Sequence, residues 1–346
     1  MIFNEGHPTG LRAPFPYFGG KRRIAAEVWR RLGNPSNYVE PFAGSLAVLL
    51  CRDPRPTPKQ VETVNDVDGL LVNVWRAIRW APDAVAEHAA WPVTEIDQIA
   101  RHRWLIGERE RITDALERDP EWYDAKAAGW WVWGACVWIG SGWCETPHRQ
   151  IPHLGDAGRG VRRQIPHLGN AGRGIRRQIP HLGDAGQGVR RQTEMDRLSF
   201  VQGWLRELSS RLENVRVTCG SWRRLVDSAT ALHHVRRCGL EGEDVTAVFL
   251  DPPYPEGGMR YVAIDDHASV YADALAWARE HGGDRRLRIA FCGYEADLPG
   301  WESLAWKTKG GFSGGKNDNQ HRESVWFSPG CLVPGGGQLG LFGEAA

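Results

Sequence analysis

Residues 248–254, VFLDPPY, place an aspartate, two prolines and a tyrosine directly after an apolar run. The run that begins at Thr246 predicts a buried strand ending just before Asp251. Prolines lack a backbone N–H and stiffen the chain, so the loop leaves a carboxylate and backbone carbonyl oxygens free to accept hydrogen bonds. An ordinary proline-rich strand exit with a surface tyrosine is the alternative. An acceptor-rich loop beside an aromatic ring suits an amino group on a flat ring.

Strand-like and helix-like patterns alternate on both sides of this loop, and the alternation predicts an α/β sheet. The predicted strands are NYVEPF (37–42), VETVND (61–66), VRVTC (215–219), TAVFL (246–250), RLRIAFC (286–292) and ESVWF (323–327). Helices are predicted at 24–32, at LAVLL (46–50), after Asp66 and near 196–212.

Residues 81–198 interrupt the α/β pattern with charged helical segments, a Trp/Gly-rich stretch and three 14-residue repeats at 150–192. Each repeat contains a proline and three glycines, which predicts loops. The chain is therefore expected to form a discontinuous domain, 12–80 plus 199–330, with 81–198 as an inserted module and 331–346 as a flexible tail.

The repeats form a local basic patch. The 346-residue chain has a formal net charge of +1, but residues 149–192 hold nine arginines and two aspartates, a local charge of +7. Such a patch can bind the phosphates of double-stranded DNA; a duplicated, tolerated loop is the alternative. The candidate DNA-binding residues are Arg149, Arg159, Arg162, Arg163, Arg173, Arg176 and Arg177.

Other features of the sequence exclude several classes of protein. The seven cysteines form no CxxC pair, and the repeated histidines come without cysteines, so no metal site is expected. No run of 18 apolar residues and no signal core is found, which predicts a cytoplasmic protein without a membrane partner. The tryptophans of 130–143 are expected mainly in the core, with DNA contact as the alternative. The oligomeric state is open.

Two further polar segments follow predicted strands. Glu40, Pro41, Phe42, Gly44 and Ser45 end the first strand, and Asp66 ends the second. Ligands of open α/β sheets bind beyond the carboxyl ends of the strands, and a glycine there lets backbone approach a ligand closely. A turn glycine and a helix-capping aspartate are the alternative interpretations.

Taken in order, these elements resemble the Dam-like DNA adenine methyltransferases over residues 15–80 and 213–330, roughly half of the chain. The family's aromatic-Gly-Gly-Lys motif is matched by YFGGK (17–21), its cofactor loop by EPFAGS (40–45), its ribose-binding acid by Asp66 and its catalytic tetrapeptide by DPPY (251–254). Residues 81–198 fill the position of the family's target-recognition segment.

The resemblance implies a Rossmann-like methyltransferase sheet that binds S-adenosylmethionine. The implied catalytic residues are Asp251, Pro252, Pro253 and Tyr254. The implied cofactor residues are Tyr17, Gly19, Gly20, Lys21, Glu40, Pro41, Phe42, Gly44, Ser45, Asp66, Ser221 and Trp222. Two positions depart from the family's pattern: Leu46 replaces a second glycine, and Ser221-Trp222 replaces an acidic residue followed by an aromatic one.

The implied reaction is methyl transfer to the N6 amino group of a flipped adenine. The Asp251 carboxylate and the Pro252 carbonyl would accept its two N–H groups, and Tyr254 would stack on the base. Other amino groups stay open as substrates: cytosine N4, RNA adenine or a protein glutamine. A catalytically silent DNA-binding relative is the non-enzymatic alternative. The target sequence and the role, whether restriction protection, its evasion or regulation, are open.

Overall fold

The computed structural model describes residues 11–17, 21–53, 56–138, 143–144, 197–228, 232, 243–254, 267–294, 296–305 and 323–333. Several predicted features lie outside these ranges: Gly19, Gly20, the arginines at 149–177, the repeats and the tail from residue 334.

Seven strands form one mixed sheet, which confirms the α/β prediction. The strands are β1 (Pro35–Glu40), β2 (Val61–Asp66), β3 (Val215–Cys219), β4 (Glu243–Leu250), β5 (Leu287–Gly293), β6 (Glu302–Ala305) and β7 (Ser324–Phe327). Their order is β3-β2-β1-β4-β5-β7-β6, with β1 to β5 parallel and β7 antiparallel to β5 and β6. The order of the first five strands is that of a doubly wound sheet, whose switch point lies between β1 and β4.

Side chains alternate between the two faces of the sheet. Val39 and Val248 belong to a buried cluster with α9 (Arg223–Val226) and α11 (His267–His281). Their neighbours Tyr38 and Ala247 belong to a second cluster with α1 (Arg22–Leu32) and α2 (Gly69–Trp80). Helices therefore bury both faces, which explains why β1 and β5 are buried along their whole length.

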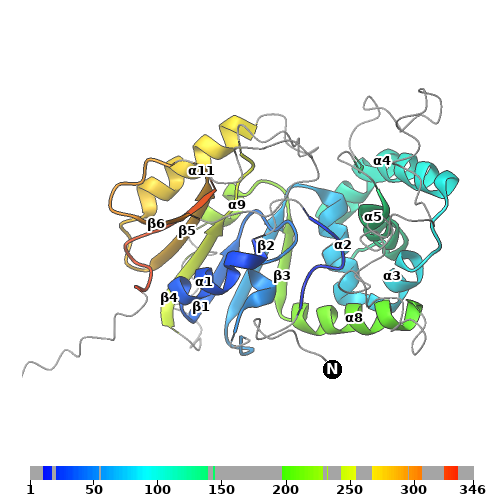
Figure 1. Cartoon of the computed structure of the whole chain (residues 1–346), viewed down its shortest axis with the longest axis horizontal. Coiled ribbons are helices and arrows are strands. Elements are labelled where there is room, and N and C mark those ends of the chain that lie inside the picture. Colours follow the sequence, from blue (N-terminus) through cyan, green and yellow to red (C-terminus); the bar gives the residue numbers. More distant parts are fainter. Residues whose placement is uncertain are drawn as a thin grey trace, which may run out of the picture.

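A group of helices gathers beyond the β3 edge of the sheet (Figure 1). The group comprises α3 (Pro82–Ala89), α4 (Glu95–Arg118), α5 (Ala125–Val137) and α8 (Arg197–Leu212). Phe15 links it to the sheet, because its ring centroid lies 5.4 Å from that of Trp75 on α2 and 4.9 Å from that of Trp131 on α5. Trp131 and Trp133 are buried in a core cluster that also includes sheet residues.

Polar side chains determine where α2, α4 and α5 begin. The Asp68 carboxylate accepts a hydrogen bond from the Leu70 N–H at the start of α2. In the same way, Thr94 accepts the Asp97 N–H at the start of α4, and Asp124 accepts the Ala127 N–H at the start of α5. Each bond satisfies a backbone donor that the first helical turn leaves without a partner. No helix in the described ranges has the length and apolar character needed to cross a bilayer.

The predicted helix at LAVLL (46–50) is wrong. The structure has only a 3-10 turn, Leu49–Cys51, because the loop after β1 uses the preceding residues for turns. Gly44 and Leu46 both have positive φ, 47° and 55°, a conformation incompatible with a right-handed helix. Asp53-Pro54 then follows, and a residue before proline disfavours the helical conformation.

Candidate functional site

The candidate site lies at the edge of the sheet where the parallel strands end. Since β1, β2 and β4 are parallel, Glu40, Asp66 and Asp251 all reach this edge. Asp251 and the Glu40 loop leave β4 and β1, which are the neighbouring strands at the switch point of the order. The structure thus places the predicted catalytic loop and the predicted cofactor loop side by side.

Two elements that run against the parallel strands bring further charges to the same edge. Strand β7 is antiparallel to β5, and its first residue, Ser324, pairs with Gly293 at the end of β5. The preceding residue, Glu323, is therefore at the site. Lys21, directly before α1, also reaches this edge.

Four side chains form a compact cluster there. Lys21 Nζ lies 2.9 Å from Asp251 Oδ1 and 2.9 Å from Glu323 Oε1. The Tyr254 hydroxyl lies 2.8 Å from Glu323 Oε1 and 3.2 Å from Asp251 Oδ1. Lys21 and Glu323 are almost fully buried, whereas the Asp251 side chain is 22% exposed. All four contacts involve at least one charged group and lie in a largely buried site, so the four side chains orient one another firmly.

Burial and neighbouring charges set the protonation of the cluster. Burial raises the pKa of Asp251. The positive charge of Lys21 partly offsets this rise, and the negative charge of Glu323 adds to it. Burial alone would lower the pKa of Lys21, but the nearby carboxylates outweigh it and raise that pKa. Burial and the adjacent acids also raise the pKa of Tyr254 well above its ordinary value, so the phenol is a hydrogen-bond donor at neutral pH.

The Asp251 carboxylate has one oxygen with contacts and one without. The hydrogen bonds described to this carboxylate, from Lys21 and Tyr254, go to Oδ1. Within the described part of the chain, Oδ2 has no such partner. The next two residues, Pro252 and Pro253, are buried and hold the loop against the sheet. A partly exposed carboxylate oxygen can accept a hydrogen bond from a ligand.

The loop after β1 turns at a glycine that neighbouring side chains hold in place. Gly44 has a φ of 47°, and its backbone N–H donates to Asp66 Oδ2 at 3.0 Å. The Tyr17 ring covers this glycine so closely that a Cβ added there would lie 2.7 Å from Tyr17 Cε1. The Trp75 indole N–H donates to the Gly44 carbonyl at 2.9 Å. These contacts fix the loop from both sides.

Asp66 ties the loop after β1 to the end of β2. Its Oδ2 accepts the Gly44 N–H, and its Oδ1 accepts the Asp68 N–H at 3.0 Å. Burial raises its pKa to about 6, although these backbone hydrogen bonds act in the opposite direction. Each carboxylate oxygen has a further lone pair, so the contacts leave Asp66 able to accept hydroxyl groups.

Glu40 is a buried carboxyl group at the end of β1, the strand next to β4. The Tyr38 hydroxyl donates to its Oε2 at 2.9 Å. Burial raises the pKa of Glu40 to about 8; the Tyr38 bond acts against this rise and the Asp251 charge adds to it. Glu40 is therefore mostly protonated at pH 7.

Aromatic rings connect the loops after β1 and β3. The ring centroids of Phe42 and Trp222 lie 5.6 Å apart, with a 35° angle between the planes. Trp222 is buried, Phe42 and Ser45 are partly buried, and Ser221 is exposed. The Asn65 amide donates to the Pro41 carbonyl at 3.1 Å and to the Gly220 carbonyl at 2.9 Å. The predicted Phe42, Ser221 and Trp222 thus come together, but no carboxylate follows β3 directly.

Sequence reasoning missed Glu323, Cys292 and Tyr294. Cys292 is buried at the end of β5, and burial together with the Asp251 charge raises the pKa of its thiol well above the ordinary value. The Tyr294 ring centroid lies 4.7 Å from that of Tyr254. The available signal for Glu323 was its position at the start of the predicted strand ESVWF, but the direction of that strand was unknown.

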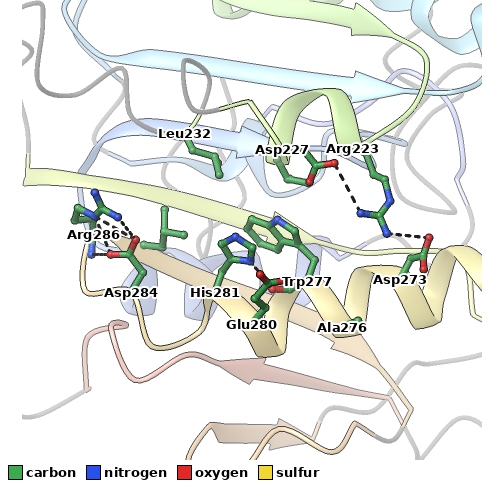
Figure 2. A pocket seen from close by; sticks show the side chains of 12 residues that line it. Arg223, Asp227, Leu232, Asp273, Ala276, Trp277, Glu280, His281, Asp284 and Arg286 are labelled. Atoms are coloured by element: carbon green, nitrogen blue, oxygen red, sulfur yellow. Dashed lines mark hydrogen bonds and ion pairs between the residues drawn. The ribbon is translucent and has the colours of Figure 1, made fainter.

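A separate pocket of about 530 Å³ lies between α9 and α11 (Figure 2). Both arginines that line it pair with aspartates of the same pocket: Arg223 with Asp273 at 3.0 Å and Arg286 with Asp284 at 2.5 Å. None of the predicted catalytic or cofactor residues lines it. The carboxylate cluster at the sheet edge, which has a partly exposed oxygen, is the stronger candidate site.

Comparison with known proteins does not assign a class to this site. No protein-family model matches the chain, and a search of curated proteins returns no match. The functional argument therefore rests on the sheet and on the residues at its edge.

Proposed function

We propose that the chain is an S-adenosylmethionine-dependent methyltransferase that modifies the N6 amino group of adenine in DNA. The observation that carries the proposal is the partly exposed Asp251 carboxylate, which β4 delivers to the switch point beside the Gly44 loop. The proposal includes a Rossmann-like methyltransferase sheet, with residues 81–198 as an inserted target-recognition module.

The residues around the Gly44 loop fit the proposed cofactor. A positive-φ glycine with a fixed backbone suits close approach of the amino acid portion, and Asp66 retains acceptor capacity for ribose hydroxyls. Phe42 and Trp222 offer aromatic surface for the adenine ring. When bound, S-adenosylmethionine supplies a methyl group on a positively charged sulfur.

The side chains of the catalytic loop supply alignment and charge. Asp251 Oδ2 would accept one N–H of the target amino group and the Pro252 carbonyl the other, which directs the nitrogen lone pair toward the methyl carbon. Transfer of the methyl group from sulfur to nitrogen would leave the electron pair of the broken C–S bond on sulfur. The Asp251 charge would stabilise the resulting positive nitrogen, which would then lose its proton to solvent. Stacking of Tyr254 on the base stays a prediction.

Adenine in DNA is preferred to other amino groups because an aspartate heads the tetrapeptide and because the inserted repeats are rich in arginine. Cytosine N4, RNA adenine and protein glutamine remain the alternative substrates, and a silent DNA-binding relative is the alternative without catalysis. Base flipping costs a few kcal/mol, which stacking and two hydrogen bonds can return.

Nucleoside mass spectrometry tests the proposal. Plasmid DNA from methylase-free cells that express the wild type should contain N6-methyladenine, and plasmid from cells expressing Asp251→Ala should contain none. Asp297→Ala, which removes a carboxylate that is 88% exposed, is the matched control and should behave as the wild type. N6-methyladenine in the Asp251→Ala sample would refute the role of Asp251. Its absence from all samples, with soluble protein that binds cofactor, would move the substrate to RNA or protein.

A further inference from the structure

The cluster at the sheet edge contains more negative than positive charge. One ammonium group, Lys21, faces two carboxylates, Asp251 and Glu323, at 2.9 Å each. With all three ionised, the cluster has a net charge of −1. Lys21 and Glu323 are almost fully buried, so solvent screens this charge weakly.

The other titratable groups around Asp251 do not cancel this charge. Tyr254, from the same loop, and Cys292, from β5, stay neutral at pH 7 because burial raises their pKa values. Glu40, from β1, has a pKa of about 8 and is mostly protonated. The charge of the cluster therefore depends on Lys21, Asp251 and Glu323.

Glu323 also determines where the two donors point. Its Oε1 lies 2.9 Å from Lys21 Nζ and 2.8 Å from the Tyr254 hydroxyl, the shorter of the two contacts of that hydroxyl. Without this carboxylate, both donors would have Asp251 as their remaining partner in the cluster. The free acceptor capacity and the unneutralised charge of Asp251 would then both be reduced.

We propose that Glu323 is a positioning residue that occupies Lys21 and Tyr254 and so keeps a net negative charge on Asp251 at the reacting centre. This inference rests on the proposed function, in which the sulfur of the cofactor and the amino nitrogen of the substrate are positive at different stages of the reaction. A net negative cluster attracts both.

The net charge of the cluster should also affect ligand binding, which can be measured without catalysis. S-adenosylmethionine carries a positive sulfur, whereas S-adenosylhomocysteine has a neutral thioether and otherwise the same groups. A net negative cluster favours the first over the second. A residue with a merely structural role would affect the two ligands equally.

The first experiment is therefore a calorimetric measurement of Kd for both ligands. In Glu323→Gln, the charge of the cluster rises from −1 to 0, so the preference for S-adenosylmethionine over S-adenosylhomocysteine should fall about fivefold. Glu323→Asp keeps the charge and should keep the preference. The double variant Lys21→Met with Glu323→Gln leaves Asp251 alone, restores the net charge of −1 and should recover most of the preference.

The second experiment compares kcat for methyl transfer to plasmid DNA. Glu323→Gln should lower kcat by about tenfold or more, and Glu323→Asp should restore part of it. Glu302→Gln is the matched control, since Glu302 is also paired with a cation, Arg31, but lies on β6 and is 54% exposed. Its kcat and its ligand preference should equal those of the wild type.

The two proposals fail in different ways. A wild type that prefers S-adenosylmethionine but methylates no DNA would contradict the proposed substrate, while the binding ratios would still decide the role of Glu323. Methyl transfer by the wild type, with unchanged ligand preference and kcat in Glu323→Gln, would overturn the role of Glu323 alone. If Glu323→Gln does not fold, the double variant decides, because it also removes the Glu323 charge and leaves no buried ammonium group in the cluster.

Discussion

At the scale of single residues, Leu46 has a backbone conformation that is unusual for its residue type. Its φ of 55° is the left-handed conformation that a glycine adopts readily. The left-handed conformation costs a leucine roughly 1–2 kcal/mol. Complete burial of the side chain, worth about 1.5–3 kcal/mol, offsets that cost.

Glu40 should make the stability of the protein depend on pH. Its pKa is raised from 4.5 to about 8 in the folded state, so the folded state favours the protonated form. The corresponding stability is present below pH 4.5 and is lost as pH rises to about 8, by up to about 5 kcal/mol.

Glu40→Gln should remove that dependence, because glutamine keeps the shape and does not ionise. Urea unfolding of wild type and variant at pH 5 and pH 9 measures it: the variant should gain stability relative to the wild type at pH 9. Equal differences between the two proteins at both pH values would contradict the raised pKa.

At the scale of elements, a buried ion pair network fastens β2 to its neighbours. Glu62, at the start of β2, lies 3.0 Å from Arg52 and 2.6 Å from Arg211 of α8, and all three side chains are almost fully buried. Within β2, the network lies near the start of the strand, whereas Asp66 of the candidate site ends it. It joins the loop before β2 and a helix that follows the long insertion.

Glu62→Gln should lower the free energy of unfolding by about 3–5 kcal/mol, because it leaves two buried guanidinium groups without a counter-charge. Urea denaturation followed by circular dichroism measures the change. Glu207→Gln, an exposed glutamate on α8, is the control and should change stability by less than about 0.5 kcal/mol. A loss below about 1 kcal/mol in Glu62→Gln would mean that the arginines find other partners.

At the scale of the whole molecule, charge is distributed unevenly. The segment 149–192 carries +7, which leaves −6 for the rest of a chain whose total is +1. Under the proposed function, a protein whose remaining residues sum to a negative charge would use this separate basic segment to bind a polyanion. The arginine-rich repeats are the segment whose composition meets this need.

Deleting residues 164–191, two repeat units, removes five arginines and one aspartate. DNA affinity should fall, and the slope of log K against log salt concentration should become shallower by about 0.9 for each lost phosphate contact. Fluorescence anisotropy at several salt concentrations measures both, with a deletion of 334–346 as the control. An unchanged slope would favour the tolerated-loop interpretation.

The sequence by itself determined the α/β class, most strands and the loops that end them. Apolar runs stop at EPFAGS (40–45), Asp66 and DPPY (251–254), and parallel strands necessarily bring such ends to one edge. Each of these patterns is local, so a single sequence is enough to recognise it. The short turn at Leu49–Cys51 was mispredicted, because apolar composition alone does not report positive φ at Leu46.

Only the tertiary structure decided which charges surround Asp251. Lys21 and Glu323 are separated by about 300 residues of sequence and meet because α1 and β7 run against the parallel strands. Strand direction depends on long-range pairing and on which face each helix covers, and neither leaves a periodic mark in the sequence. The same holds for the pKa of Glu40, which follows from its burial in the assembled sheet.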